Sequence, residues 1–253
     1  MVERRTLLIA AVGVAVVVTA GFATAVARRS GRSSCDDLPR GSEQVALDPE
    51  DFTIDIDNPY WPMAAGSRWV YHESEPDEGI EQDIVVTVTG QTKTVAGVET
   101  RVVHEVTTTD EGEQVEVTDD WYAQDTCGNV WYFGEQTREH EAGEEPTTKG
   151  SWEAGVEGAQ PGIAIPAHPE PGLAYRQEYA QGEAEDQGVV LSIDEEAEVP
   201  FGHFDGAVLT KDFTPLEPDI VEYKLYAKDV GPVLAIGISG GADRAQLTRY
   251  ARG

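Results

Sequence analysis

The chain has 253 residues, of which 47 are acidic and 18 basic, so its formal net charge at pH 7 is −29. A surface of that charge repels phosphate backbones, which excludes nucleic acid as an expected partner. Hydrophobic residues make up 40% of the chain, enough for one large β domain or two small fused ones. The acidic residues are spread along the chain, and we expect them to solvate the surface rather than to bind a metal.

The N-terminus predicts export or membrane insertion. A short tail (1–5) precedes an uncharged apolar run (6–26), which is long enough to cross a bilayer as a helix. A cleaved secretory signal also remains open, because Ala23-Thr24-Ala25 offers a small-x-small exit. Arginines flank the run on both sides, and read strictly the positive-inside rule would place the domain in the cytoplasm. The β-rich body and the lack of a cytosolic cofactor motif favour a single-pass protein with its domain outside, or a secreted one.

A linker is expected over 27–57, where Arg, Ser, Gly, Pro and Asp dominate without an apolar period. It contains Cys35, and the other cysteine of the chain is Cys127. An exported location would allow a disulfide between them. Two unrelated thiols are an equally good interpretation at this point.

From residue 58 the apolar period is two, which indicates strands. A first meander (58–134) is followed by a connector rich in Gly, Pro and Glu (135–171) and a second meander (172–253). The second meander repeats the first, because Gly66-x-x-Trp69 returns as Gly172-x-x-Tyr175 and Tyr122-Ala123-x-Asp125 returns as Tyr226-Ala227-x-Asp229. The sequence therefore predicts an all-β protein made of two duplicated antiparallel meanders.

The meanders are expected to form a sandwich, a barrel or a half-barrel, since each solution limits exposed strand edges. Aligning the repeats at a nearly constant offset pairs two sets of alternating apolar residues. We expect both sets to face inward: Ile84, Val86 and Val88 from the first repeat, and Val189, Leu191 and Ile193 from the second.

One hairpin concentrates aromatic residues: Trp121, Tyr122, Trp131 and Tyr132. Adjacent residues of a strand face opposite sides, so one set serves the core. The other set is a candidate outer platform for a sugar, lipid or protein. Cross-strand aromatic pairing is the more ordinary explanation.

Motifs for catalysis or metal binding are weak. The G-x-S-x-G pattern at 237–241 places Ser239 in a glycine-rich turn, and no histidine follows it. The five histidines have no zinc spacing, and Asp55, Asp57 and Asn58 lack the rest of a calcium loop. We expect no catalytic residue, metal or cofactor.

Four stretches, 120–135, 150–155, 161–163 and 214–218, resemble a family of uncharacterised exported bacterial proteins, usually labelled hypothetical proteins or lipoproteins. The resemblance implies export but transfers no activity. The Tyr-Ala-x-Asp-x-x-Gly-x-Val hairpin is also similar to hairpins in envelope lipoproteins with half-open, LolA-like barrels. That resemblance implies a curved sheet that holds an apolar ligand.

Two functions follow as hypotheses. The first is a non-catalytic extracytoplasmic binding or structural module, either attached to the membrane by its N-terminal helix or secreted, with a lipid, glycan or protein as its ligand. The alternative is a cell-envelope hydrolase that uses a carboxylate pair. That alternative requires two acids that converge in a cleft with shifted pKa values.

Overall fold

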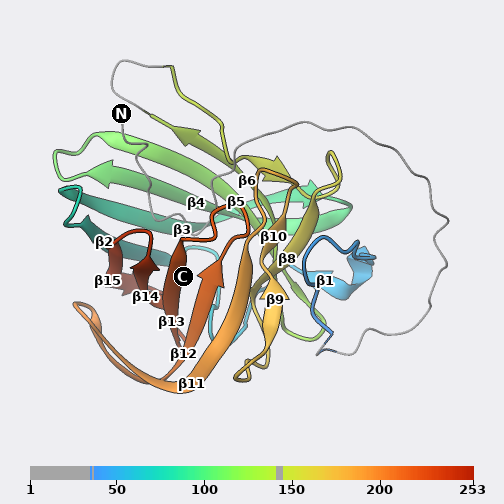
Figure 1. Ribbon diagram of the computed structural model, residues 1–253. Coiled ribbons are helices and arrows are strands. Elements are labelled where there is room, and N and C mark those ends of the chain that lie inside the picture. Colours follow the sequence, from blue (N-terminus) through green and yellow to red (C-terminus); the bar gives the residue numbers. More distant parts are fainter. Residues whose placement is uncertain (1–34, 36, 141–144) are drawn as a thin grey trace.

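The structure is a computed structural model that describes residues 35, 37–140 and 145–253. These residues form 15 strands, joined in one antiparallel sheet, and a single 3-10 turn at Pro49–Asp51 (Figure 1). The predicted all-β fold class is confirmed. Within the same ranges no helix has the length and apolar character needed to cross a membrane. The helix expected over 6–26 lies outside the described residues.

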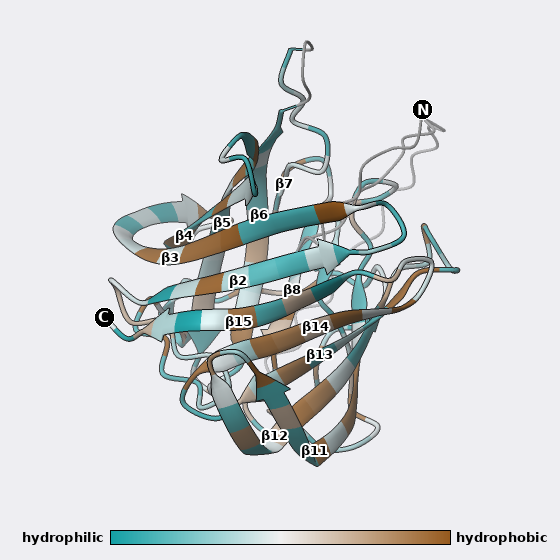
Figure 2. Ribbon diagram, turned by 90° about the vertical axis from the view of Figure 1, so that its left-hand side faces the viewer, coloured by the Kyte–Doolittle hydropathy of each residue, from teal (hydrophilic) through white to brown (hydrophobic). Residues whose placement is uncertain are grey.

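Two consecutive meanders make up most of the sheet. The first contains β2 (Arg68–Glu75), β3 (Ile80–Val95), β4 (Val98–Thr109), β5 (Gln114–Asp125) and β6 (Val130–Glu139). The second contains β9 (Ala174–Arg176), β11 (Gln187–Val199), β12 (Gly202–Phe213), β13 (Val221–Ala227) and β14 (Gly231–Ser239). The last strand, β15 (Arg244–Ala251), pairs with β14 on one edge and β2 on the other, so it joins the two meanders (Figure 2).

The sheet closes on itself through one short segment. β9 pairs with β11, β10 (Glu178–Tyr179) pairs with β8 (Gln160–Ile165), and only Gln177 separates β9 from β10. β8 also pairs with β6. Gly162 permits this closure, because a Cβ atom there would lie 2.3 Å from the carbonyl oxygen of Gln177. Of the predicted sandwich, barrel and half-barrel, the protein therefore adopts a near-closed barrel.

Each repeat begins with the same hydrogen-bonded corner. The amide of Gly66 donates to the carbonyl of Val88 at 2.8 Å, and the amide of Gly172 donates to the carbonyl of Val190 at 2.8 Å. Both glycines have φ near +90°, a conformation that favours glycine. From this corner onward the strands of the two repeats correspond one to one. β9, β11, β12, β13 and β14 of the second repeat are the counterparts of β2, β3, β4, β5 and β6 of the first.

This corner corrects the expected register of the second repeat. In the second repeat, Val190 occupies the position that Val88 occupies in the first. Val190 is fully buried, whereas Leu191 and Ile193 are 38% and 43% exposed. The expected inward set of Val189, Leu191 and Ile193 is therefore wrong, although Ile84, Val86 and Val88 are buried as expected. The offset between the repeats is 106 at Gly172 but 102 at Val190, three less than the offset of 105 that aligns Val88 with Ile193. A displacement by an odd number of residues exchanges the two faces of a strand.

Where the structure describes it, the chain before the barrel is packed rather than extended as a linker. Leu38 and Ile56 are buried, and β1 (Phe52–Thr53) pairs with β5. Residues 37–47, which we call the strap, lie against the barrel through Leu38, Val45 and Leu47.

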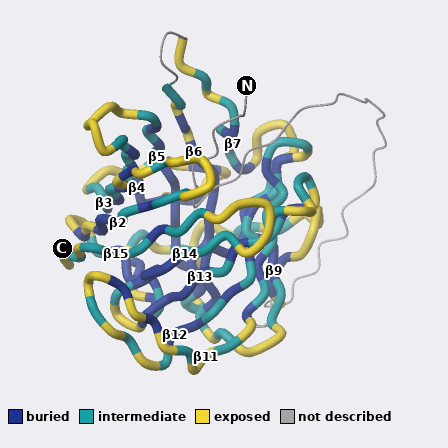
Figure 3. Tube along the Cα trace, turned by 60° about the vertical axis from the view of Figure 1, so that its left-hand side comes forward, coloured by how far each residue is buried: buried dark blue, intermediate teal, exposed yellow. Residues whose placement is uncertain are grey.

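The described parts of the connector, 135–140 and 145–171, are also built into the barrel. They supply the end of β6, the short β7 (Trp152–Glu153) and β8. The side chains of Trp152, Ile163 and Ile165 are buried. Buried residues follow the walls of the barrel, and exposed ones gather at its turns (Figure 3).

Candidate functional site

The interior of the barrel is centred on Trp61, which precedes β2. Its ring lies 5.5 Å from Tyr122 and 6.1 Å from Tyr226, measured between ring centroids. These two tyrosines occupy equivalent positions in the two repeats. Trp61 therefore packs between the meanders and fills the space where a central ligand would otherwise lie.

The four aromatic residues of the candidate platform are all buried, with exposed fractions between 2% and 8%. Tyr122 and Tyr132 stack at 4.9 Å inside the barrel. Trp131 is covered by Phe52 of β1 at 5.8 Å, and the ammonium group of Lys93 lies 3.1 Å above the Trp121 ring. The expected exposed platform is therefore absent from this hairpin, because the N-terminal segment and a lysine cover its outer side.

Carboxylates of the first meander converge inside the barrel. Glu116 accepts hydrogen bonds from the hydroxyls of Thr118 and Thr137, each at 3.0 Å. Asp120 accepts one from the Tyr132 hydroxyl at 2.7 Å. Burial raises the pKa of Glu116 and of Asp120 to about 7. It also raises the pKa of the nearby Glu135, whose carboxylate oxygens are buried without a hydrogen-bond partner.

The second meander places an ion-pair cluster in the interior. The ammonium of Lys224 lies 2.8 Å from Glu222 and 3.1 Å from Asp212. Burial raises the pKa of Glu222 to about 7. Burial alone would lower the pKa of Lys224, but the carboxylates of Glu222 and Asp212 outweigh it and raise that pKa above its usual value.

Two interior cavities lined by described residues are too small for a substrate. One of about 20 Å³ is lined by Tyr122, Tyr132, Glu178 and Lys224 among others, and another of about 30 Å³ lies between Tyr71 and Leu234. Each has room for about one water molecule. The converging acids satisfy the geometric condition for the hydrolase hypothesis only in part, because the cavities of about 20 and 30 Å³ beside the interior charged groups have no room for a substrate. The mostly apolar cavity between Tyr71 and Leu234 is too small for the lipid that the LolA-like resemblance implies.

A larger, open pocket lies where the strap crosses the closure segment. Its volume is about 320 Å³, and its walls come from the strap, β9, β10, the start of β11 and the turn after β12. The lining residues are Gly41, Ser42, Arg176, Glu178, Tyr179, Gln181, Glu185, Gln187 and Pro215. We call it the strap pocket. It is the candidate functional site, because its volume falls in the range of small-molecule sites.

Arg176 fastens the strap to the barrel. Its Nη1 atom donates to the carbonyls of Gly41 and Glu43, both at 2.7 Å, and its Nη2 atom donates to the carbonyl of Pro161 at 2.8 Å. The side chain is 1% exposed. Burial lowers the pKa of Arg176 to about 10, a value at which the guanidinium is still charged at neutral pH.

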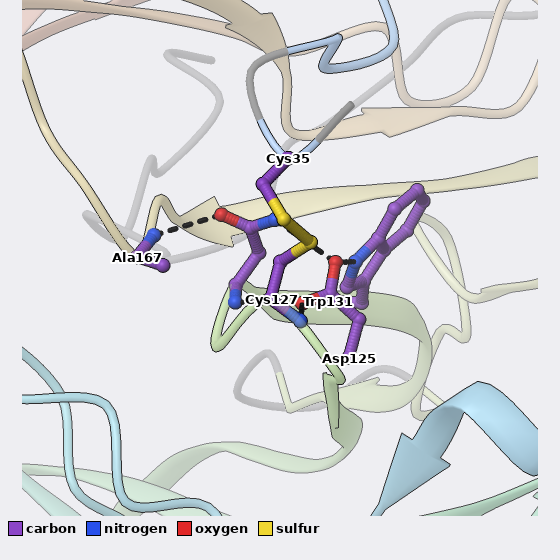
Figure 4. The surroundings of a disulfide bond; sticks show 6 residues. Cys35, Asp125, Cys127, Trp131 and Ala167 are labelled. Carbon is purple, nitrogen blue, oxygen red and sulfur yellow. Dashed lines mark hydrogen bonds between the residues drawn. A yellow bond between two sulfur atoms is a disulfide. The ribbon is translucent and has the colours of Figure 1, made fainter. Parts of the chain in front are cut away.

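A disulfide between Cys35 and Cys127 tethers the chain just before the strap (Figure 4). The two Cα atoms are 5.5 Å apart. Asp125 orders the turn that carries Cys127, because its carboxylate accepts from the amides of Cys127 and Asn129 and from the Trp131 indole. The tether and β1 thus hold the strap at its two ends.

The remaining candidate residues have structural roles. Asp57 accepts from Gln124 Nε2 at 2.6 Å, and Asn58 donates to the carbonyl of Gly128 at 2.8 Å, so both secure the entry to the barrel. Ser239 donates to the carbonyl of Asp219. In the described part of the chain no three His, Cys, Asp or Glu side chains lie where they could hold a metal ion.

Sequence reasoning missed Arg176 and Glu178, which line the strap pocket. The residues flank Gln177 in a segment that reads as the ordinary start of the second meander. The repeat motif could have drawn attention to this segment, because Arg176 directly follows Tyr175, the counterpart of Trp69 in the first repeat.

No family model matches the chain, and no curated protein is detectably similar to it. Two solved structures are similar in fold. A predicted exported protein with a YmcC-like fold from Bacteroides fragilis is 14% identical, with a TM-score of 0.43 over 76% of this chain and 98% of that chain. A predicted lipoprotein from Parabacteroides distasonis is 12% identical, with a TM-score of 0.42 over 77% of this chain and 99% of that chain.

Proposed function

We propose that the protein is a non-catalytic extracytoplasmic binding module whose ligand occupies the strap pocket. The observation that carries this proposal is the contrast in volume between about 320 Å³ at the strap and about 20 to 30 Å³ in the barrel interior. The disulfide supports an oxidising location outside the cytoplasm.

The chemistry of the pocket supports a small polar ligand rather than a lipid. Its walls carry the carboxylates of Glu178 and Glu185, the amides of Gln181 and Gln187, and the ring of Tyr179. Such groups orient a ligand by hydrogen bonds. The apolar side chains of the repeats instead pack on each other and on Trp61.

The proposal is tested by native mass spectrometry of the full-length protein after equilibration with a panel of amino acids, amines, dicarboxylates and monosaccharides. Gln181→Trp would fill the pocket from an exposed position, and Gln91→Trp is the matched control at an exposed position outside it. We expect a compound that wild type and the Gln91 variant retain and the Gln181 variant loses. Equal retention by both variants, or no retained compound, contradicts the proposal.

A further inference from the structure

We propose that Lys224 and Asp212 join in an isopeptide bond, an amide between the two side chains, with Glu222 as the proton carrier. The bond forms spontaneously inside the folded barrel and cross-links β12 to β13. It is a modification of the second meander, so it is independent of the strap pocket and of the proposed function.

The register of β12 and β13 brings the three side chains together. Asp212 lies directly opposite Glu222, and Lys224 follows Glu222 by two residues on the same strand. Residues two apart on a strand share one face. The ammonium nitrogen of Lys224 lies 3.1 Å from Asp212 Oδ2 and 2.8 Å from Glu222 Oε2. A nucleophile, an acceptor carboxyl and a proton carrier are therefore in direct contact.

The surroundings of this cluster favour an amide over an ion pair. The three side chains are between 7% and 12% exposed, and the adjoining cavity of about 30 Å³ is lined mainly by apolar groups, such as those of Ile84 and Leu234. Opposite charges are costly to keep in such surroundings, whereas an amide is neutral. The same cavity has room for about one water molecule, which is the product that the reaction releases.

Asp212 is prepared to accept the new bond. The side-chain amide of Gln177 donates to Asp212 Oδ2 at 3.0 Å. A donor on this oxygen stabilises the negative charge that develops when the carboxyl carbon is attacked. The other oxygen, Oδ1, is buried and has no hydrogen-bond partner among the described residues. Oδ1 is therefore the oxygen that leaves as water.

The reaction balances within the cluster. The ammonium of Lys224 passes one proton to the carboxylate of Glu222, and the free amine attacks Cγ of Asp212 to form a C–N bond. Glu222 then gives this proton to the departing oxygen. That oxygen takes a second proton from the nitrogen and leaves as water when its C–O bond breaks. The products are a neutral amide and one water molecule, and Glu222 ends as it began.

The free amine is the scarce reactant. Burial alone would lower the pKa of Lys224, but the carboxylates of Glu222 and Asp212 hold it above its usual value, so most molecules carry the ammonium form. Burial raises the pKa of Glu222 to about 7, which makes it a stronger base than an exposed glutamate. Well-aligned groups in contact react as if at concentrations of about 10⁵ M or more. Because the bond forms only once per chain, a slow reaction is sufficient.

Tryptic digestion of the full-length protein tests the bond directly, because trypsin cleaves only after a lysine whose amine is free. An unlinked chain is cut after Lys211 and Lys224 and yields the peptide 212–224. A linked chain resists the cut at Lys224 and yields the peptide 212–228, lighter by one water molecule. Fragmentation of that peptide should release no pieces from between 212 and 224, which are closed into a ring. We expect the linked peptide as the main form in wild type.

Two variants test the roles of the residues. Lys224→Arg keeps the positive charge but removes the nucleophilic amine, so the link should be absent. Glu222→Gln keeps an oxygen that accepts from Lys224 but cannot carry the proton, and the link should form about a hundredfold more slowly. Lys228→Arg is the matched control at an exposed position just after β13, and it should link as wild type does.

The wild-type digest decides the inference whether or not the variants fold. Recovery of the peptide 212–224 at full mass from wild type would show that Lys224 stays in an ion pair and would overturn the bond. Fragments from between 212 and 222 in a linked peptide would reveal a link to Glu222 and overturn the choice of Asp212. Equal rates in wild type and the Glu222 variant would overturn the role of the proton carrier. None of these outcomes bears on the strap pocket, which the metabolite panel tests separately.

Discussion

Arg176 Nη1 and the carbonyl oxygen of Gly41 are 2.7 Å apart, and this contact joins the strap to the segment that closes the barrel. The same guanidinium reaches Glu43 and Pro161. One buried side chain thus holds together the strap, β8 and β9, and it forms a wall of the proposed binding site.

Replacing Arg176 should release the strap. Arg176→Gln removes the donor from the buried carbonyl of Pro161 and from the strap carbonyls of Gly41 and Glu43, and we expect a loss of about 2–4 kcal/mol in the free energy of unfolding. Arg68→Gln is the control, since Arg68 is exposed at the start of β2. Urea titration followed by tryptophan fluorescence measures both, and equal stability of the two variants would contradict the role of Arg176.

The disulfide should contribute independently of that contact. Cys35 and Cys127 are 92 residues apart in the sequence, and a loop of that length gives a stabilisation of about 4 kcal/mol in the chain-entropy model. The double variant Cys35→Ser, Cys127→Ser should unfold at a lower temperature than wild type. Adding a dithiol should lower the melting temperature of wild type toward that of the variant and leave the variant unaffected. A wild-type melting temperature that ignores the reductant would argue against the tether.

Barrel closure should depend on Gly162. A Cβ atom at this position would overlap the main chain of Gln177 and Arg176, so Gly162→Ala should cost more than about 3 kcal/mol in stability. Gly202→Ala is the control, because a Cβ atom at Gly202 meets no atom within 4 Å. Thermal unfolding compares them. A Gly162 variant as stable as the Gly202 variant would mean that the closure segment does not approach so closely.

The buried acids predict that stability falls as the pH rises. The pKa of Glu116 is about 7 in the folded protein, against 4.5 as its ordinary value. Below about pH 4.5 the group is protonated in both states, and between that pH and about 7 the unfolded chain loses the proton first. The folded state therefore loses up to about 3 kcal/mol from this group across that window. Asp120, Asp186 and Glu222 have pKa values raised in the same direction.

The Glu116→Gln variant tests this assignment, since the amide oxygen can still accept from Thr118 and Thr137. Denaturation at pH 5 and pH 8 should show a smaller loss of stability in this variant than in wild type. Glu111→Gln, at an exposed turn, should retain the wild-type dependence. Identical slopes in all three proteins would show that Glu116 ionises normally.

The meanders and the repeat follow from the sequence, because alternating apolar residues and polar turns are local signals. The buried face of β11 does not follow from the sequence, since the offset between the repeats has already changed at Val190 without a mark in composition. Glu116, Thr118 and Asp120 alternate on one face of β5, but acidic residues are usually solvated, and only closure of the barrel buries them. The packing of the strap could not be predicted, because the strap contacts the barrel through single side chains such as Leu38 and so shows no apolar periodicity in the sequence.

The most direct test of the strap pocket as a binding site is to map a bound ligand by backbone amide chemical shifts of the isotope-labelled protein, titrated with a compound that the metabolite panel shows to be retained. The account predicts saturable shifts confined to Gly41, Ser42 and the segment from Arg176 to Gln187, which together surround the strap pocket. Shifts that centre on another surface of the barrel, or no saturable shifts at all, would contradict it.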